Sequence, residues 1–590
     1  MIRFIKVSVG NSLILSLSIQ LTNVMFWKGF KLGGIMISFL GLFQWGFLID
    51  SYSSRFIIFC RSIGVLVLIY SNYYILNREV GLFNLTIFSF ITCILLLTCS
   101  RNLLTMFVGW EGVGIISFVL IGWFIRRHRA ISASSSAFLY NRFADYFFFI
   151  LLLWEMTGSQ GLFYVQRSEL PIWGIRSLRG ISYIVVLSVW MATAGKSAQF
   201  FFHPWLTLAM EGPTPVRSLL HSRTIVVAGV YLLLKLHPLI VHLNISLLNG
   251  LILSTRMVTI LFTSIWALNQ RDIKKIIALS TTSQLRFMII VCCLGLYDLA
   301  YLHMLLHGFF KALLFLGRGV LIHNNITHSQ DLHKINLPPL RESSSFRLIF
   351  LVGVLGLMGV PFIGAFSRKH IILDAGLTVG SILLRDSLLP ASSFLFRASV
   401  VGLFLSAIIT VGYSSKLLIA IIASSAFAIT SGAYSRSVRA ILPITLLSSL
   451  SIILGNLLGN TIKTRTRSVC SQEDFLYSTF IVIILCGLGL YLFTGQRAYL
   501  FLLNKTSKFV IWKVLYMEKL LKKILFLLTE KSILKNGLKR FIPPLGANKW
   551  LANLSKNSYN LNLVTLVNMN DLLISRLITG FFGFMVYRLN

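Results

Sequence analysis

The stretch WMATAGKSAQFFFHPWLTLAMEGPTPVRSLLHS, residues 190–222, decides the fold. It is largely apolar, yet it carries Lys196 inside an apolar run and is interrupted at His203-Pro204 and again at residues 212–215, Gly-Pro-Thr-Pro. A proline inside a helix removes a backbone hydrogen bond and breaks the helix. Broken helices are tolerated within a membrane where they line a cavity. The stretch therefore predicts a membrane helix that is broken close to a charged side chain.

The composition extends this pattern to the whole chain. Of 590 residues, 56% are hydrophobic and 12% are charged, and the mean hydropathy is +0.81. Soluble globular proteins carry about 25% charged residues, so a solvated surface around an ordinary core is excluded. Apolar runs of about 20 residues, long enough to cross a bilayer as helices and too long for barrel strands, recur along the sequence. We expect an all-α polytopic membrane protein with roughly fourteen to seventeen transmembrane helices.

A strong basic excess accompanies this hydropathy, because 54 Lys and Arg against 18 Asp and Glu give a formal charge of +36. In a soluble chain such an excess suggests nucleic-acid binding, but this sequence offers no soluble basic domain to carry it. Basic loops that set orientation and meet anionic lipid such as cardiolipin are the expectation for a membrane protein. The seven cysteines show no spacing typical of a disulfide framework, a zinc site or an iron–sulfur cluster.

The sequence divides into five segments. Residues 1–100 predict N-terminal transmembrane helices, residues 101–380 hold nearly every ionisable residue in an apolar context, and residues 381–500 return to plainer spans. Residues 501–548 place basic and apolar positions on opposite helical faces, which predicts an amphipathic helix lying along the membrane surface. Residues 549–590 predict a linker and a terminal transmembrane anchor. The surface helix is either a lateral tether or a lipid-surface helix without a mechanical role.

Glu111 and Lys196 are charged residues inside apolar parts of residues 101–380. Charged side chains deep in a span cost about 2.5–3.5 kcal/mol each on insertion scales, so they are candidates for function. Glu111 stands in a glycine-rich segment, where glycines allow close helix approach; a glutamate at a helix end facing water is the alternative. Lys196 precedes the helix break, and desolvation disfavours the charged form of a buried amine, as a proton relay requires.

Histidines and a second lysine continue this pattern. His221 follows the helix break, while His303, His307 and Lys311 recur at every fourth residue and so share one helix face. A metal site at the HxxxH spacing is the alternative, yet no carboxylate lies on that face and Lys311 would repel a cation. Two imidazoles and an amine in a row favour proton transfer.

A second interrupted span, GVPFIGAFSRKHII, carries Arg368 and Lys369. An ordinary basic loop at a helix end is the alternative reading of these two residues. Each half of residues 101–380 thus places an ionisable helix residue, Glu111 or Lys311, before a broken helix that carries a basic residue. Two related halves with charge near the midplane are typical of transporters built from repeats.

Eight stretches of the chain resemble one known family. They are FVGWEGVG, YNRFAD, AGKSAQFFFHPWL, AMEGPTPV, VVAGVYLL, DIKKIIALSTTSQ, HMLLHGFFKALLFL and IHNN, and they span about residues 100–370. The chain closely resembles the subunit 5 family of NADH dehydrogenase, the distal antiporter-like subunits of respiratory complex I. The resemblance implies two related helix-bundle repeats with broken helices, plus the lateral helix and terminal anchor with which the family clamps neighbouring subunits.

The resemblance also implies a proton path. Glu111 and Lys196 would form an ion pair that controls the proton affinity of the lysine, with Asp145 as an auxiliary acid on the next helix. Further residues would continue a hydrated polar axis into the second half, where Arg368 stands at the position of the family's lysine and Lys369 at that of the following acid. Because guanidinium does not deprotonate in proteins, Lys369 is the alternative carrier to Arg368. The axis residues are His221, His303, His307 and Lys311.

Four further arginines stand in or next to spans where members of this family usually carry Ser, Ala or Gly. Without partners, four such charges would cost on the order of 10 kcal/mol. Either they snorkel or pair with lipid, or the isolated protein carries other residues there, because organellar codons are read differently or the RNA is edited. We favour the second explanation. The four residues are Arg217, Arg223, Arg286 and Arg318.

These features together predict a proton-translocating membrane-arm subunit of NADH:ubiquinone oxidoreductase that couples quinone reduction to proton pumping. The chain lacks a Rossmann glycine fingerprint and a cysteine set. We therefore expect no cofactor or metal in this chain, and NADH, FMN, iron–sulfur clusters and ubiquinone in other subunits. Other membrane-arm and accessory subunits of complex I would be its partners.

The expected location is the mitochondrial inner membrane. The N-terminal sequence lacks the long Arg- and Ser-rich presequence of an imported protein, so we expect synthesis inside the organelle. Two alternatives stay open. One is a subunit of a multisubunit cation/proton antiporter, and the other is a scaffold subunit that completes the membrane arm without pumping.

Overall fold

The computed structural model describes the chain in the following ranges: residues 32–39, 43–75, 80–125, 127–157, 179–199, 202–222, 224–242, 246–293, 295–324, 330–331, 340–360, 369, 372–373, 390–423 and 438–466. The predicted surface helix of residues 501–548 and the predicted anchor of residues 549–590 lie outside these ranges, as do Arg223 and Arg368.

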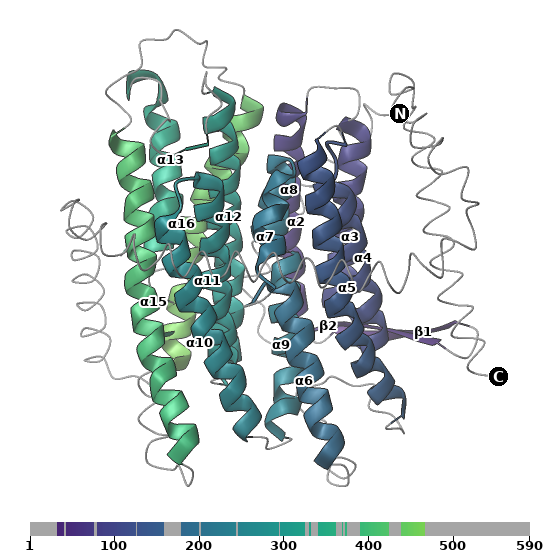
Figure 1. The fold of residues 1–590 in the computed structure, drawn as a ribbon. Helices are drawn as coiled ribbons and strands as arrows, with labels where there is room; N and C mark the ends of the chain where they lie inside the picture. The colour runs from purple at the N-terminus through teal and green to yellow at the C-terminus, as the bar shows by residue number, and fades with distance from the viewer. Residues whose placement is uncertain are drawn as a thin grey trace, which may run out of the picture. The chain divides into compact units, whose positions relative to one another are not determined.

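The described part of the chain is built mainly from long helices that run side by side (Figure 1). Helix α4 packs against α3 and α5, α5 against α6, and α6 against α9, while α11 packs against α10 and α12. The helices are α2 (Ser51–Tyr74), α3 (Val80–Cys99), α4 (Leu103–Ile121), α5 (His128–Thr157), α6 (Arg179–Lys196), α7 (Pro204–Leu208), the 3-10 helix η1 (Ala209–Glu211), α8 (Thr214–Ser222), α9 (Ile225–His242), α10 (Ser246–Asn269), α11 (Ile273–Cys293), α12 (Tyr297–Asn324), α13 (Leu340–Met358), α15 (Pro390–Ala423) and α16 (Val438–Thr466).

Two strands precede helix α2. Strands β1 (Leu32–Phe39) and β2 (Phe43–Ile49) form an antiparallel hairpin whose pairing runs from Leu32 opposite Ile49 to Phe39 opposite Phe43. Their sequences, LGGIMISF and FQWGFLI, combine glycine, a poor helix former, with β-branched and aromatic residues that favour strands. Transmembrane helices were predicted for residues 1–100, and this hairpin was not predicted.

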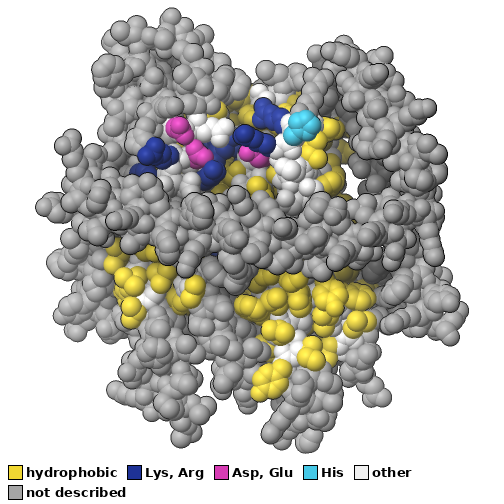
Figure 2. Space-filling model, in the orientation of Figure 1, with side chains coloured by type: hydrophobic (Ala, Val, Ile, Leu, Met, Phe, Trp, Pro, Cys, Tyr) yellow, Lys and Arg dark blue, Asp and Glu magenta, His cyan; other side chains and the backbone are white. Residues whose placement is uncertain are grey.

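Apolar side chains cover the outside of the bundle, and many polar ones lie inside it. Large hydrophobic residues such as Leu85, Phe88 and Val401 are exposed on the helices, as lipid-facing residues are in a membrane protein. Lys196 and Lys311, in contrast, are fully buried. Figure 2 shows charged side chains gathered towards one end of the helices and hydrophobic ones nearer the other end of this face.

The predicted interruption of the chain after residue 190 is observed. Helix α6 ends at Lys196 because Ala198 adopts a left-handed conformation with φ 51°. The backbone N–H of Gln199 donates to the carbonyl of Ala194 (3.0 Å), and that of Ala198 donates to the carbonyl of Gly195 (3.4 Å). This pair of bonds is a Schellman motif, which satisfies the last carbonyls of a helix. Lys196 is therefore the last residue of α6, directly before the break in the chain.

The chain then advances through the short helices α7, η1 and α8 before the long helix α9 begins. Eight described helices are long and apolar enough to cross a membrane by length and composition, and four shorter apolar helices accompany them. The prediction of an all-α polytopic membrane protein is confirmed for the described residues, which are helical apart from turns, short connections and the hairpin β1–β2. The predicted total of roughly fourteen to seventeen spans includes residues outside the described ranges, so it stays a prediction. The predicted segment boundaries also stay predictions.

Candidate functional site

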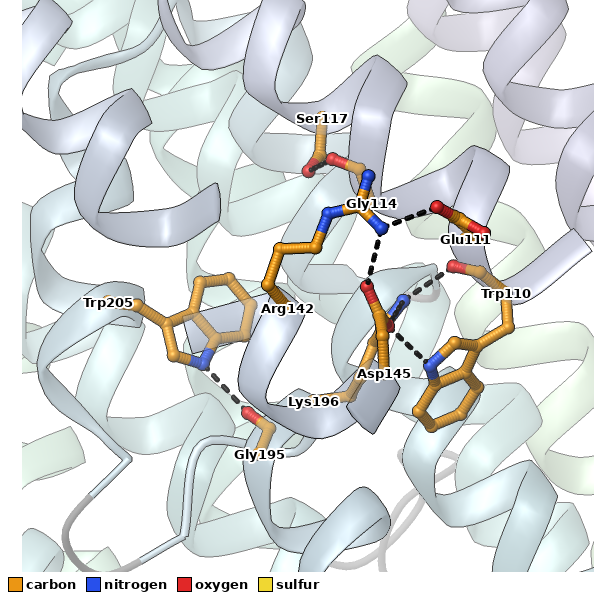
Figure 3. Close-up of polar contacts among 9 residues, drawn as sticks. All are labelled: Trp110, Glu111, Gly114, Ser117, Arg142, Asp145, Gly195, Lys196 and Trp205. Carbon is orange, nitrogen blue, oxygen red and sulfur yellow. Dashed lines mark hydrogen bonds and ion pairs between the residues drawn. The ribbon is translucent and has the colours of Figure 1, made fainter. Parts of the chain in front are cut away.

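Three neighbouring helices bring two acids and two bases together in the first half of the core (Figure 3). Glu111 lies on α4, Arg142 and Asp145 lie on α5, and Lys196 lies at the end of α6. The side chain of Lys196 is fully buried and that of Asp145 is 8% exposed, whereas Arg142 and Glu111 are 32% and 24% exposed. The cluster therefore runs from a buried ion pair to a partly accessible one.

Lys196 has one charged and one neutral partner. Its Nζ lies 3.7 Å from Asp145 Oδ1 and donates a hydrogen bond to the backbone carbonyl of Trp110 (2.5 Å). The same Nζ lies 4.4 Å from the centroid of the Trp110 ring, within the range of a cation–π interaction. Its place at the carbonyl end of α6 also favours positive charge. These contacts compensate for the loss of hydration of the buried ammonium.

Glu111 forms its ion pair with Arg142. The predicted ion pair joined Glu111 to Lys196 instead, so the predicted partner of Glu111 was wrong. Arg142 Nη1 donates to Glu111 Oε1 at 2.5 Å and lies 4.0 Å from Asp145 Oδ2. Asp145, predicted as an auxiliary acid, is the carboxylate that faces Lys196. Arg142 was not predicted as a site residue, although the sequence YNRFAD places it one helical turn before Asp145.

Small residues allow this close arrangement. A Cβ added at Gly195 would lie 2.6 Å from the Cβ of Ala144, so α5 and α6 approach one another too closely for any larger side chain. A Cβ added at Gly114 on α4 would lie 3.6 Å from Lys196 Nζ. The glycines therefore place Asp145 and the Trp110 backbone within reach of the lysine.

Lys311 lies between α12 and α11 in the second half of the core. It is fully buried, and its Nζ donates to Ser280 Oγ (2.5 Å) and to the carbonyl of Ile277 (3.4 Å). Both of these acceptors are neutral, unlike the carboxylate that faces Lys196. His303, two helical turns earlier on α12, lies with Nε2 3.2 Å from Gln284 Oε1 on α11. The structure thus brings two of the predicted axis residues against a polar face of α11.

His221 and His307 are buried beside aromatic rings. The ring of His221 on α8 lies 5.4 Å from that of Phe315 on α12, and the ring of His307 lies 5.2 Å from that of Phe310, edge to face. Helices α8 and α12 pack against each other, so His221 belongs to the helix pair that links the two halves. The four predicted axis residues therefore all lie on two helices in contact.

Lys369 is buried at the end of α13. Helix α13 ends at Met358 before Gly359, whose φ of 80° is left-handed, and Lys369 Nζ donates to the carbonyls of Leu357 and of Met358, the latter at 3.1 Å. A cation there is favoured by the carbonyl end of the helix. Lys369 thus lies at the end of a helix that is followed by a left-handed residue. Lys196 lies at a similar helix end, that of α6. Its predicted neighbour Arg368 is outside the described residues.

The buried arginines differ in how well their charges are accommodated. Arg286 donates to the carbonyls of Thr259 and Ala198, both at 3.0 Å, and to Thr263 Oγ1. Arg217 donates through Nε to the carbonyl of Gly212 (2.6 Å), while its Nη1 has no hydrogen-bond partner in the part of the chain that the structure describes. Arg318 is fully buried, and none of its three guanidinium nitrogens has a partner among the described residues. Position 318 therefore carries the least compensated charge of the three.

Several hydroxyl and amide side chains on α11 contact the site but were not predicted from the sequence as site residues. Ser280 contacts Lys311, Gln284 contacts His303, and Ser283 Oγ lies 3.1 Å from Tyr413 Oη on α15. The signal was present in DIKKIIALSTTSQ, because consecutive polar residues inside an apolar span need hydrogen-bond partners. Trp110 also escaped selection, since a tryptophan in an apolar helix has an ordinary packing role.

This arrangement can hold and pass protons. Lys196 and Asp145 place an ammonium 3.7 Å from a carboxylate, so a proton can pass between them when the two groups approach to hydrogen-bond distance. Lys311 donates to the hydroxyl group of Ser280, which can itself donate a hydrogen bond. Among the described residues, no group of three or more His, Cys, Asp or Glu side chains is arranged to hold a metal ion.

Comparison with known proteins identifies the family. Residues 100–395 match the family described as NADH:quinone oxidoreductase/Mrp antiporter, transmembrane region. The chain is 40% identical over 338 residues to NADH-ubiquinone oxidoreductase chain 5 of Geomys personatus, covering 56% of this chain and 53% of the relative. It is 38% identical over 352 residues to the corresponding chain of Branchiostoma lanceolatum, covering 59% and 55%. This chain thus spans about half the length of these relatives.

The fold has a counterpart among solved structures. A chain of the Mrp complex from Dietzia sp. superposes with a TM-score of 0.64 over 85% of this chain and 56% of that chain, at 21% sequence identity. At this identity the likeness concerns the fold alone. Because the family match covers residues 100–395 and includes α4, α5, α6 and α12, which carry the buried charges, the chain belongs to the family of NADH:quinone oxidoreductase and Mrp antiporter transmembrane proteins.

Proposed function

We propose that this chain is a proton-translocating membrane-arm subunit of NADH:ubiquinone oxidoreductase, in which Lys196 takes up and releases a proton. The observation that carries the proposal is the charged cluster inside the family's core, in which the buried pair of Lys196 and Asp145 adjoins the partly exposed pair of Arg142 and Glu111. Similarity to relatives named NADH-ubiquinone oxidoreductase chain 5 supports the choice of complex.

Arg142 offers a way to control Lys196. It contacts Glu111 at 2.5 Å and lies at the edge of ion-pair distance, 4.0 Å, from Asp145. When Arg142 moves towards Asp145, it weakens the attraction between that carboxylate and Lys196, and the ammonium loses part of its stabilisation. When it moves towards Glu111, the attraction returns. A shift of one guanidinium therefore changes how firmly Lys196 holds its proton.

The second half would receive and pass the proton onward. Buried Lys311 donates to the hydroxyl group of Ser280, and buried Lys369 donates to the carbonyl of Met358, so both of these acceptors are neutral. His221 on α8, with His303 and His307 on α12, forms the proposed connection between the two lysine sites. Arg368 is retained as a candidate for the second-half site beside Lys369, as the sequence predicts.

The proposal includes a setting and partners. The chain would reside in the mitochondrial inner membrane, be made within the organelle, and contact other membrane-arm and accessory subunits and anionic lipid such as cardiolipin. NADH, FMN, iron–sulfur clusters and ubiquinone would bind to other subunits. The multi-pass helical fold and the names of the relatives support this setting.

A cation/proton antiporter subunit is the second candidate function, because the family and the solved Mrp complex include antiporters. Both functions would use Lys196. They differ in the driving force, which is NADH oxidation in one case and a cation gradient in the other.

The experiment replaces Lys196 with Ala in the assembled complex. Purified complex is reconstituted in liposomes, and proton uptake is measured with a pH-sensitive dye during NADH oxidation. We expect proton uptake per NADH to fall while NADH oxidation in the presence of an uncoupler persists. Lys275→Ala is the matched control, because Lys275 is an exposed lysine that pairs with Asp272, three residues earlier on the chain. Unchanged proton uptake in Lys196→Ala would identify a scaffold and contradict the proposal.

A further inference from the structure

Trp110 contacts both members of the buried ion pair (Figure 3). Its indole N–H donates to Asp145 Oδ1 at 2.8 Å, and its backbone carbonyl accepts from Lys196 Nζ at 2.5 Å. Its ring also lies 4.4 Å from Lys196 Nζ. One fully buried residue thus holds the acid through its side chain and the base through its backbone and ring.

These contacts keep the acid and the base apart. Asp145 Oδ1 accepts the indole hydrogen bond and is the same oxygen that faces Lys196 at 3.7 Å, beyond the ordinary hydrogen-bond distance of about 3 Å. The shorter hydrogen bond of Lys196 goes instead to the Trp110 carbonyl. Without the indole N–H, this carboxylate oxygen would be free to close on the ammonium.

We propose that Trp110 is a positioning residue that holds Asp145 and Lys196 as a separated pair and so keeps the proton of Lys196 releasable. The inference rests on the proposed function of Lys196. Hydrogen bonds to charged groups are strong and directional, and a directly bonded pair in a buried site would retain the ammonium form more firmly. Trp110 acts through the two charged residues and makes no transfer itself.

Trp110→Phe tests this role in the assembled complex, because phenylalanine keeps an aromatic ring at this position while it removes the N–H donor together with part of the indole ring system. We expect proton uptake near neutral pH to fall by on the order of tenfold, and the pH profile of pumping to shift to higher pH. The shift follows because a directly bonded Asp145 lets Lys196 release its proton only at higher pH. Trp110→Met also removes the donor and serves as the second variant if the first fails to assemble, because the methionine side chain has no N–H or O–H group.

Trp205→Phe is the matched control. The buried Trp205 indole also donates a hydrogen bond, to the carbonyl of Gly195 at 3.0 Å, but its acceptor carries no charge. We expect Trp205→Phe to leave the pH profile in place. A second test combines Trp110→Phe with Asp145→Asn, and we expect no shift beyond that of Asp145→Asn alone.

The inference is overturned if Trp110→Phe has the same pH profile as Trp205→Phe, or if its shift persists in the Asp145→Asn background. Failure of the underlying function looks different, because Lys196→Ala would then pump normally. Loss of pumping in Lys196→Ala together with an unshifted Trp110→Phe removes only the role assigned to Trp110.

Discussion

At the scale of single residues, the buried lysines in the two halves of the core have different partners. Lys196 faces a carboxylate, and that carboxylate has a second cation nearby in Arg142. Lys311 and Lys369 rest on hydroxyl and carbonyl oxygens. Because removal of one partner from a buried ion pair leaves an uncompensated charge, the first half is the one in which small movements of a partner change the energy of a proton most.

Replacement of Arg142 by Gln tests its control of Lys196. Both Arg142 and Glu111 are partly exposed, so we expect the loss of their ion pair to cost only about 1 kcal/mol of stability. Proton pumping should fall several-fold, because Asp145 would face Lys196 without a competing cation. Thermal unfolding and proton uptake of the reconstituted complex measure the two effects. Arg129→Gln, an exposed arginine on the same helix, is the control, and equal pumping in the two variants would refute this role.

Peptide mass spectrometry can identify the residue that the isolated protein carries at position 318. A buried guanidinium without hydrogen-bond partners costs several kcal/mol, and Arg318 also lies where Gly319 brings α12 close to Tyr70 and Thr214. We expect peptide mass spectra of the isolated protein to show a small uncharged residue at 318. Arg286, with three hydrogen bonds, is the internal comparison. A spectrum with Arg at 318 would establish that the charge is real.

The sequence identified the buried charges but not all of their partners. Lys196 and Lys311 are recognisable because a charge in an apolar run is costly. The pairing of Glu111 with Arg142 depends on which face of α4 packs against α5. The hydrophobic periodicity of the sequence does not define that orientation. Trp110 has no distinguishing pattern, because its function depends on a hydrogen bond between helices.

At the scale of elements, close helix contacts decide which side chains meet. Helices α5 and α6 touch at Ala144 and Gly195, the residues that directly precede Asp145 and Lys196 in the sequence. Contact between small residues therefore sets the separation of the acid and the base one residue further on.

Gly195→Ala tests this contact. The added methyl group would lie 2.6 Å from the Cβ of Ala144 and force the helices apart. We expect a loss of about 1–3 kcal/mol in stability, as for other overpacked sites, together with reduced proton uptake. Gly81→Ala on α3 is the control, because an added Cβ there meets no atom within 4 Å. Normal pumping by Gly195→Ala would show that the helix separation does not govern the pair.

The sequence predicted elements well where composition is decisive. The break after α6 followed from prolines and glycine, yet the exact end at Lys196 did not, because Ala198 supplies the left-handed residue that glycine usually provides. The hairpin β1–β2 was missed, because its apolar residues suit a membrane helix as well as a strand.

At the scale of the whole molecule, the distribution of side chains identifies the environment but not the assembly. Exposed hydrophobic residues on α3, α5 and α15 fit a membrane, and buried charges fit transport. The matching family includes both NADH:quinone oxidoreductase and Mrp antiporter proteins, so the fold does not decide between these two assemblies. The sequence alone favours the pump through eight motif stretches, and the relatives named chain 5 agree with it.

The most direct measurement is native electrophoresis of gently solubilised source membranes, followed by an in-gel stain for NADH oxidation and peptide mass spectrometry of the active band. We predict that peptides of this chain are found in the large band that oxidises NADH. Their presence only in a smaller complex without NADH oxidation would contradict the assignment and leave the antiporter function in its place.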